Sequence, residues 1–136
     1  MKILKTAIKE RNKKMSSLIL LISAITLASV GQVLLKKGMV VVGVFNVSDE
    51  SMITYFLKAF TNIYIIIGFL SFAASTLVWL LVLSKLPLSL AYPCVALGYI
   101  IVTILSKVFF NEVITFMRWL GIVVICIGVF LISRSG

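Results

Sequence analysis

The amino-acid sequence predicts an all-α integral membrane protein built from four membrane-spanning helices. Of its 136 residues, 62% are hydrophobic and only 12% are charged, and the mean hydropathy is +1.22. A soluble domain of this length cannot bury so large an apolar fraction, so lipid must solvate much of the surface. Because backbone polar groups must be paired inside a bilayer, apolar stretches of about 20 residues are expected to be helices.

Four stretches have the length that a bilayer crossing needs. The first contains no charge and is followed by two lysines. The third has Pro93 in its first turns, where a missing backbone N–H is best tolerated. We expect a basic tail over residues 1–16 and a single transmembrane domain over residues 17–136, with helices at about 17–35, 63–83, 88–109 and 116–133.

The connection between the first two spans is longer than the others. Within residues 50–60 apolar side chains recur at helical spacing, which favours a short amphipathic helix lying in the membrane interface. A re-entrant piece and a plain loop are the alternatives. The other connections are short, so successive helices are expected to be antiparallel neighbours.

The formal net charge of +9 comes from residues at the ends of the apolar runs, with no aromatic residues interleaved in a basic stripe. This pattern favours anchoring at lipid headgroups over nucleic-acid binding. Six basic residues precede the first span, so we expect both termini on the cytoplasmic side of a bacterial-type inner membrane. The rest of the chain has little charge bias, which leaves dual insertion as an alternative.

No set of residues in the sequence suggests catalysis. There is no His, and Cys94 and Cys126 each lie alone inside an apolar run, which speaks against metal or disulfide chemistry. The chain lacks a GxSxG elbow and a Gly-rich phosphate loop, and no Asp or Glu lies inside the four spans. We expect neither an enzyme nor a cofactor. Glu112, near a basic helix end, is expected to do no more than form a surface ion pair with Lys107 or Arg118, an interaction typically worth little.

Polar residues within the spans indicate helix contacts or a wet cavity, because facing lipid leaves their hydrogen bonds unmet. In the first span, Ser29, Gln32 and Lys36 share one face. A bond from Gln32 to a neighbouring helix is as good an explanation as a cavity. The third span has a longer stripe, for which two bulky tyrosines favour a cavity lining over close packing. Its members are Ser89, Tyr92, Ala96, Tyr99, Thr103 and Ser106.

The second and fourth spans each add one feature. Trp79 shares a face with Ser71 and Ser75, although it could instead be an interfacial anchor. Gly121 and Gly128 are seven residues apart on one side of the last span, where small residues let helices approach closely. We interpret this side as a dimer interface. Packing within the chain is the competing interpretation.

Several short strings carry a family resemblance: GQVLLK at 31–36, WLLVL at 79–83, LPLSLAYP at 86–93, NEV at 111–113 and WLG at 119–121. Together they resemble the drug/metabolite transporter superfamily, with its small multidrug resistance-like and EamA-type proteins. Small multidrug resistance proteins carry an essential glutamate in helix one, where this chain has Ala28. The paired subunits that flip aminoarabinose-phosphoundecaprenol are more similar.

This resemblance implies a small multidrug resistance-like fold that moves a polyprenyl-phosphate-linked sugar across the membrane by alternating access. The partner would be an identical chain or a related four-helix subunit. A small-solute or cationic drug exporter and a non-transporting accessory subunit are the alternatives. The candidate substrate-binding residues are Ser29, Gln32, Lys36, Trp79, Tyr92, Tyr99, Thr103, Lys107 and Arg118, and the candidate dimer-interface residues are Gly121 and Gly128.

Overall fold

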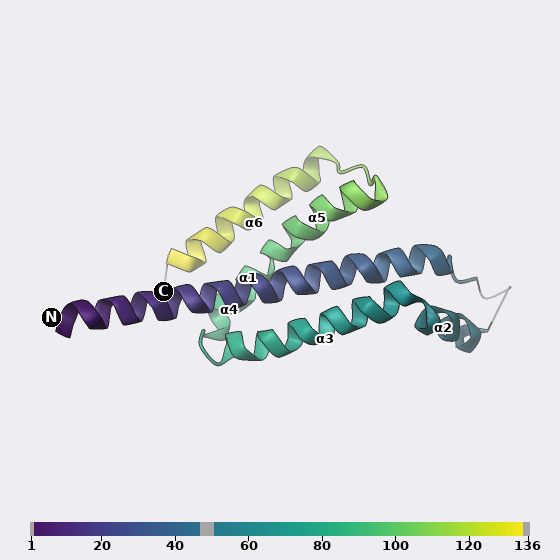
Figure 1. Cartoon of the computed structure of the whole chain (residues 1–136). Coiled ribbons are helices and arrows are strands. Elements are labelled where there is room, and N and C mark those ends of the chain that lie inside the picture. The colour runs from purple at the N-terminus through teal and green to yellow at the C-terminus, as the bar shows by residue number, and fades with distance from the viewer. Residues whose placement is uncertain (1, 47–50, 135–136) are drawn as a thin grey trace.

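The computed structural model describes residues 2–46 and 51–134, whose regular elements are all helices (Figure 1). Four helical stretches of these residues are long and apolar enough to cross a membrane, which confirms the predicted fold class. The third of them consists of two consecutive helices. The elements are α1 (Lys2–Val42), α2 (Met52–Thr61), α3 (Ile63–Leu83), α4 (Leu88–Val95), α5 (Leu97–Phe110) and α6 (Phe116–Arg134).

Helix α1 is longer than the expected span of 17–35, because it begins at Lys2 and continues to Val42. Residues 2–16 contain neither Gly nor Pro and are rich in good helix formers, so nothing in the supposed tail stops the helix. The lysines that follow residue 35 do not stop it either. The helix ends at Gly43, which has a φ of +93° and whose N–H donates to the Met39 carbonyl over 3.0 Å.

The third span is one stretch in the prediction but two helices in the structure. Pro93 has no N–H to donate, and its ring crowds the carbonyl of Ser89, four residues earlier. The chain then tightens, because the N–H of Ala96 donates to the Pro93 carbonyl over 3.1 Å and that of Tyr99 donates to the Ala96 carbonyl over 3.1 Å. The polar stripe of this span is therefore divided between α4 and α5.

Helix α2 lies in the segment for which a short amphipathic helix was one of three possibilities. It begins after Ser51, whose hydroxyl accepts from the backbone N–H of Thr54, and residue 50 lies outside the described residues. Tyr55 and Ala59 are buried, and the Tyr55 hydroxyl donates to the Gly43 carbonyl over 2.8 Å. This contact ties α2 to the end of α1. The location of α2 in a membrane interface stays a prediction.

Helix α1 is the centre of the arrangement, with α3 on one side and α5 and α6 on the other (Figure 1). Helix α4 leads from the end of α3 past α1 to α5. Among the described residues, α3 does not contact α5, and α6 contacts only α4 and α5. The four spans therefore do not close into a four-sided bundle.

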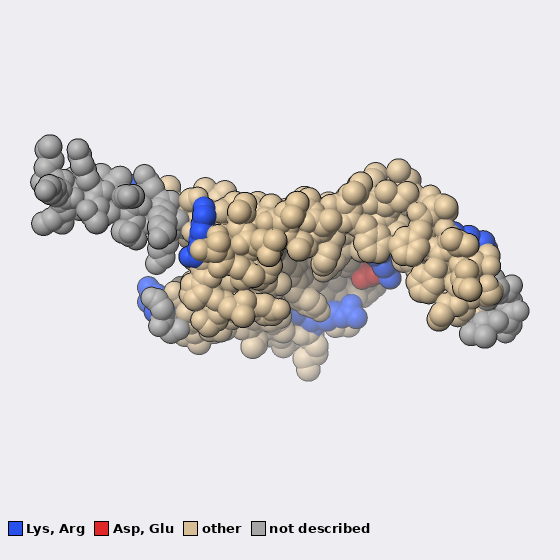
Figure 2. Space-filling model, turned by 90° about the horizontal axis from the view of Figure 1, so that it is seen from below, with Lys and Arg blue, Asp and Glu red and all other residues tan. Residues whose placement is uncertain are grey.

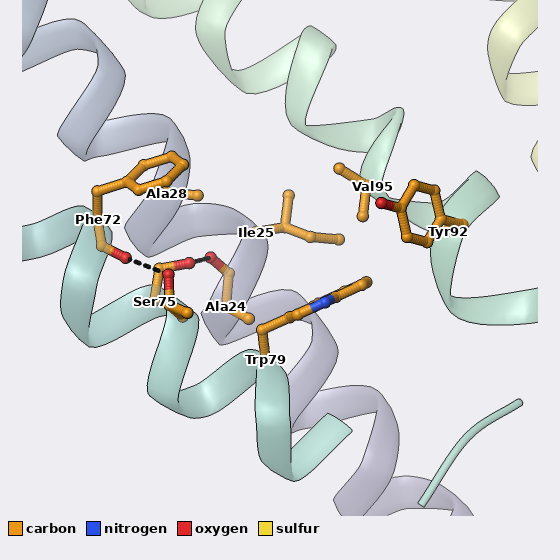
Figure 3. Close-up of a pocket in the computed structure, with 9 residues that line it drawn as sticks. Ala24, Ile25, Ala28, Phe72, Ser75, Trp79, Tyr92 and Val95 are labelled. Carbon is orange, nitrogen blue, oxygen red and sulfur yellow. Dashed lines mark hydrogen bonds between the residues drawn. The ribbon is translucent and has the colours of Figure 1, made fainter. Parts of the chain in front are cut away.

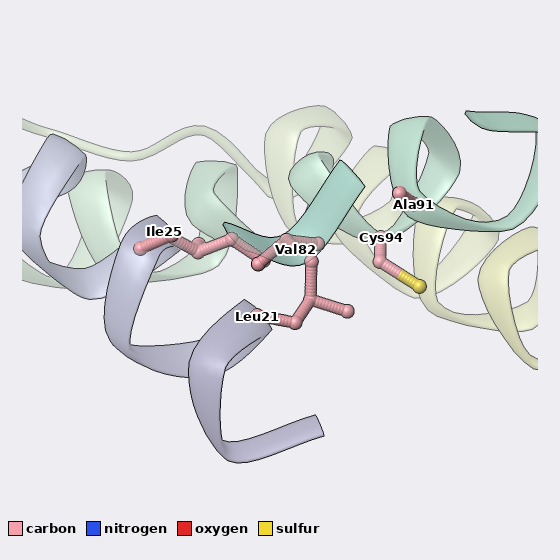
Figure 4. Packing of buried hydrophobic residues seen from close by; sticks show 6 residues of the cluster. Leu21, Ile25, Val82, Ala91 and Cys94 are labelled. Atoms are coloured by element: carbon pink, nitrogen blue, oxygen red, sulfur yellow. The ribbon is translucent and has the colours of Figure 1, made fainter. Parts of the chain in front are cut away.

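The main core lies where α1, α3 and α4 meet (Figure 4). Val82 and Ala91 are completely buried there, and Leu21, Ile25 and Cys94 pack around them. Toward the other end of α1, Gly31 faces Gly68 of α3 so closely that a Cβ at either glycine would lie 3.0 Å from the carbonyl oxygen of the other. Small residues thus bring the two backbones into contact.

Candidate functional site

A groove runs lengthwise along α1, with α3 and α4 as walls at one end and α5 and α6 at the other. It consists of three cavities that share residues: Ile25, Ala28, Tyr92 and Val95 join the first to the second, and Gln32, Tyr99 and Val102 join the second to the third. From Ala24 to Lys36 the floor extends about 18 Å, at about 1.5 Å per helical residue. The groove therefore covers more than half of a hydrocarbon core about 30 Å thick.

The first cavity is aromatic and has a volume of about 230 Å³ (Figure 3). Trp79 of α3 and Tyr92 of α4 meet edge to face across it, with ring centroids 6.2 Å apart. Phe72 adds a third aromatic ring to the lining. Ala28 of α1 also lines the cavity, and its small side chain leaves space above the helix. The Ser75 hydroxyl is used in packing, since it donates to the Ala24 carbonyl over 2.8 Å. This end offers a ligand mainly ring edges and faces.

The middle cavity lies between α1 and the junction of α4 with α5. Ser29 lines it, but this serine is only 3% exposed. Its Oγ is 2.8 Å from the Ile25 carbonyl and 3.5 Å from that of Gly98. A hydroxyl has one proton, and the shorter contact takes it. Gly98 lets α5 approach, because a Cβ there would lie 3.3 Å from the Ser29 hydroxyl.

The third cavity has a volume of about 290 Å³ and contains the charged residues of the groove. Lys36 of α1 faces Glu112, in the link between α5 and α6, with Nζ 3.9 Å from Oε1. Arg118 lines the same cavity. On the face shown in Figure 2, a red acidic side chain lies beside blue basic ones at a hollow. The side chains of Lys36 and Glu112 are 57% and 39% exposed, so this pair contributes little to stability.

The expected partner of Glu112 was wrong. The sequence suggested Lys107 or Arg118, but the ion pair that forms is with Lys36. Asn111 ends α5 in the left-handed conformation, with φ of 51°, so the chain reverses direction directly before Glu112. The link 111–115 is short, and it holds the carboxylate close to the end of the groove.

Two hydroxyl groups of α5 complete the charged cavity. Thr103 Oγ1 donates to the Tyr99 carbonyl over 2.7 Å, and Ser106 Oγ donates to the Thr103 carbonyl over 3.3 Å. Because these protons are committed to the helix backbone, both oxygens can offer only lone pairs to a ligand. The amide of Gln32, by contrast, makes no hydrogen bond to another described residue.

The structure brings most of the candidate residues into one groove. Gln32, Lys36, Tyr99, Thr103 and Arg118 line the charged cavity, Ser29 lies in the middle, and Trp79 and Tyr92 line the aromatic end. Lys107 lines none of these cavities. One residue beyond Ser106 along α5, its side chain points about 100° away from the groove.

Sequence reasoning missed several lining residues. Glu112 was expected to form only a surface ion pair and was not counted among the binding residues, although its short link had to keep it near the ends of both neighbouring helices. Phe72, Val95 and Val102 also line the groove. In the sequence, these apolar residues cannot be distinguished from residues that face lipid or pack inside the protein, so no pattern marks them as lining a groove. Gly121 and Gly128 lie elsewhere, on a side of α6 where a Cβ would meet nothing within 4 Å.

The fold defines a multi-pass membrane protein with a groove along its first spanning helix. The chain belongs to the EamA-like transporter family, whose model matches residues 50–134. This range includes α2 to α6 and therefore three of the four spans. No solved structure matches the chain.

The chain is also similar, over part of its length, to curated proteins that are named as flippase subunits. The chain is 39% identical over 59 residues to a probable 4-amino-4-deoxy-L-arabinose-phosphoundecaprenol flippase subunit, ArnE, of Pseudomonas syringae, covering 43% of this chain and 55% of that one. It is 36% identical over 70 residues to the protein of the same name in Yersinia pestis, covering 52% of this chain and 61% of that one. The matches thus span just over half the length of these relatives.

Proposed function

We propose that this chain is a subunit of a flippase that carries a polyprenyl-phosphate-linked sugar across the cytoplasmic membrane by alternating access. It would act as a carrier without chemical conversion of the lipid. The observation that carries the proposal is the groove, which joins a cationic cavity to an aromatic one along a single helix. The names of the flippase subunits that the chain resembles support the same substrate class.

The charged cavity suits the phosphodiester of such a lipid. Lys36 and Arg118 supply two cations at one end of the groove, and charge-assisted hydrogen bonds to phosphate oxygens are stronger than neutral ones. Lys36 is near the end of its span, because neighbouring Gly38 packs against Ile65 and Asn62 at the start of α3. The phosphate would therefore be held near one membrane surface.

The rest of the groove suits a sugar and leaves the prenyl chain in lipid. Tyr92, Tyr99 and Trp79 offer aromatic surface together with polar groups, which lowers the cost of moving a hydroxylated headgroup through a medium of low dielectric constant. Among the described residues α3 and α5 do not contact each other, and we propose that the headgroup enters the groove between them. A long apolar tail could follow the headgroup without entering the protein.

An open groove also favours a second subunit. One set of four spans covers the groove on too few sides to seal it, and a partner would supply the missing wall. The side of α6 with Gly121 and Gly128 is free to take part in pairing. The partner would be an identical chain or a related four-helix subunit.

The role of Lys36 can be tested by translocation in proteoliposomes. We expect Lys36→Met to lower the initial rate for undecaprenyl-phosphate-linked aminopentose about tenfold, because the neutral side chain loses a charge-assisted bond to phosphate. The matched control is Lys37→Met. Lys37 lies over the Tyr64 ring, 4.6 Å from its centroid, and lines none of the three cavities.

The control variant is expected to retain the wild-type rate. An unchanged rate in Lys36→Met would exclude Lys36 as a phosphate ligand. Uptake of cationic toxicants driven by a proton gradient, with no movement of the lipid, would instead favour a drug exporter.

A further inference from the structure

The charged cavity contains a carboxylate that a site for a purely anionic headgroup would not need. Lys36 and Arg118 give it two positive charges, and Glu112 places a negative charge 3.9 Å from one of them. A phosphate bound between the two cations would lie within a few ångströms of this carboxylate, and like charges at such distances repel. The repulsion disappears if the headgroup itself brings a positive charge to Glu112.

The neighbouring hydroxyl groups point to the same kind of ligand. The protons of Thr103 and Ser106 are donated to carbonyls of α5, so their oxygens act only as acceptors in the cavity. Together with the carboxylate they form a wall of acceptors on the side of α5 and its following link. An ammonium group, with three N–H donors and a positive charge, satisfies such a wall.

We propose that Glu112 is a specificity-determining residue that selects zwitterionic headgroups, in which an ammonium group accompanies the phosphate. This inference rests on the proposed function and narrows its substrate class. In the empty groove Glu112 pairs with Lys36. When the headgroup arrives, Lys36 and Arg118 bind the phosphate and Glu112 binds the ammonium, so one internal ion pair is exchanged for three with the ligand. The exposed, 3.9 Å pair with Lys36 is weak enough to be exchanged.

The test compares two probes that differ at the amine, which is charged in one and is a neutral amide in the other. The first is undecaprenyl-phosphate-linked aminopentose, and the second is the same lipid with its amine acetylated. Equilibrium binding of each probe is measured with the full-length protein in nanodiscs. We expect wild type to bind the amine about tenfold more tightly than the amide, as for a charge-assisted bond in a partly exposed site.

Three variants test whether Glu112 causes the preference for the amine probe. Glu112→Gln keeps the shape of the side chain but removes its charge, and its preference for the amine is expected to fall to about twofold or less. Glu112→Asp keeps the charge and should retain part of the preference. Lys37→Met changes the charge at the same end of the spans without touching the groove and should leave it unchanged. Thermal unfolding of each variant checks that the fold is intact.

Each outcome separates this inference from the proposed function. Equal binding of both probes by wild type would overturn the selectivity and leave the flippase proposal standing. Full preference retained in Glu112→Gln would exclude Glu112 as its source. Failure of wild type to bind either probe would overturn both proposals. The comparison of the two probes on wild type needs no variant, so a misfolded substitution does not prevent a decision.

Discussion

At the scale of single residues, glycines decide how closely the two main helices pack. A Cβ on Gly31 would meet the backbone of α3 at the Gly68 oxygen, 3.0 Å away, and at the Phe72 nitrogen, 3.3 Å away. Backbone atoms cannot rotate aside as a flexible side chain can. Nearby, the Ser71 hydroxyl donates to the Leu27 carbonyl over 2.9 Å and links the same pair of helices. These contacts hold the floor of the groove against its α3 wall.

We therefore expect Gly31→Val to destabilise the protein by about 1–3 kcal/mol, the usual cost of inserting atoms into a packed contact. The measurement is unfolding in mixed detergent micelles, followed by circular dichroism. Ala74→Val is the control, because it introduces the same side chain at an exposed position of the spanning helix α3. Equal destabilisation by both substitutions would contradict the packing argument.

At the scale of elements, α6 differs from the other spanning helices. Among the described residues it contacts only α4 and α5, and Ile122 is its one buried residue. A Cβ at either of its glycines would meet nothing within 4 Å among the described residues, so contacts between those residues do not explain the glycine spacing. The side that contains Gly121 and Gly128 is therefore available to a neighbouring subunit.

Replacing both glycines by leucine is expected to weaken association between subunits about tenfold, because bulk at a close helix contact separates the backbones. Energy transfer between labelled chains in bilayers, measured over a range of protein-to-lipid ratios, gives the association constant. Val123→Phe is the control, since it adds bulk to an exposed position on the other side of α6. Unchanged association in the double leucine variant would place the dimer interface elsewhere.

At the scale of the whole molecule, successive spans alternate in direction, so Lys36 and Lys85 lie toward opposite membrane surfaces (Figure 1). Lys36 and Lys37 lie toward the end of the first candidate span, Met15–Val42, and Lys85 follows the second, Ile63–Leu83. The basic residues before the first span predict that the termini and Lys85 face the cytoplasm. The charged cavity would then lie toward the opposite surface.

This orientation predicts that a membrane-impermeant maleimide labels Lys37→Cys from outside intact cells and labels Lys85→Cys only after the membrane is opened. The unsubstituted chain is the control, because its own Cys94 and Cys126 lie within membrane spans. Labelling of both positions from the same side would contradict the alternating spans. Labelling of each position from both sides would show dual insertion.

Several features of the fold could be predicted because they depend only on neighbours along the chain. Apolar length identifies a span whatever surrounds it, and α3 is mainly apolar and contains no charged residue between Asn62 and Ser84. Helical spacing likewise places Gln32 and Lys36 on one face. Hydropathy did not predict where α1 begins and ends. Hydropathy indicates where a helix leaves the lipid, whereas the helix itself continues until Gly43.

The sequence by itself determined the all-α class, the four spans and the helix faces with polar groups, because lipid imposes strict rules of length and hydrogen bonding on each segment. Only the tertiary structure decided which faces meet. It divided the third span at Pro93, turned Lys107 away from the groove and brought Glu112 to Lys36. Such contacts depend on the rotation and separation of helices distant in sequence, and no local pattern encodes either quantity.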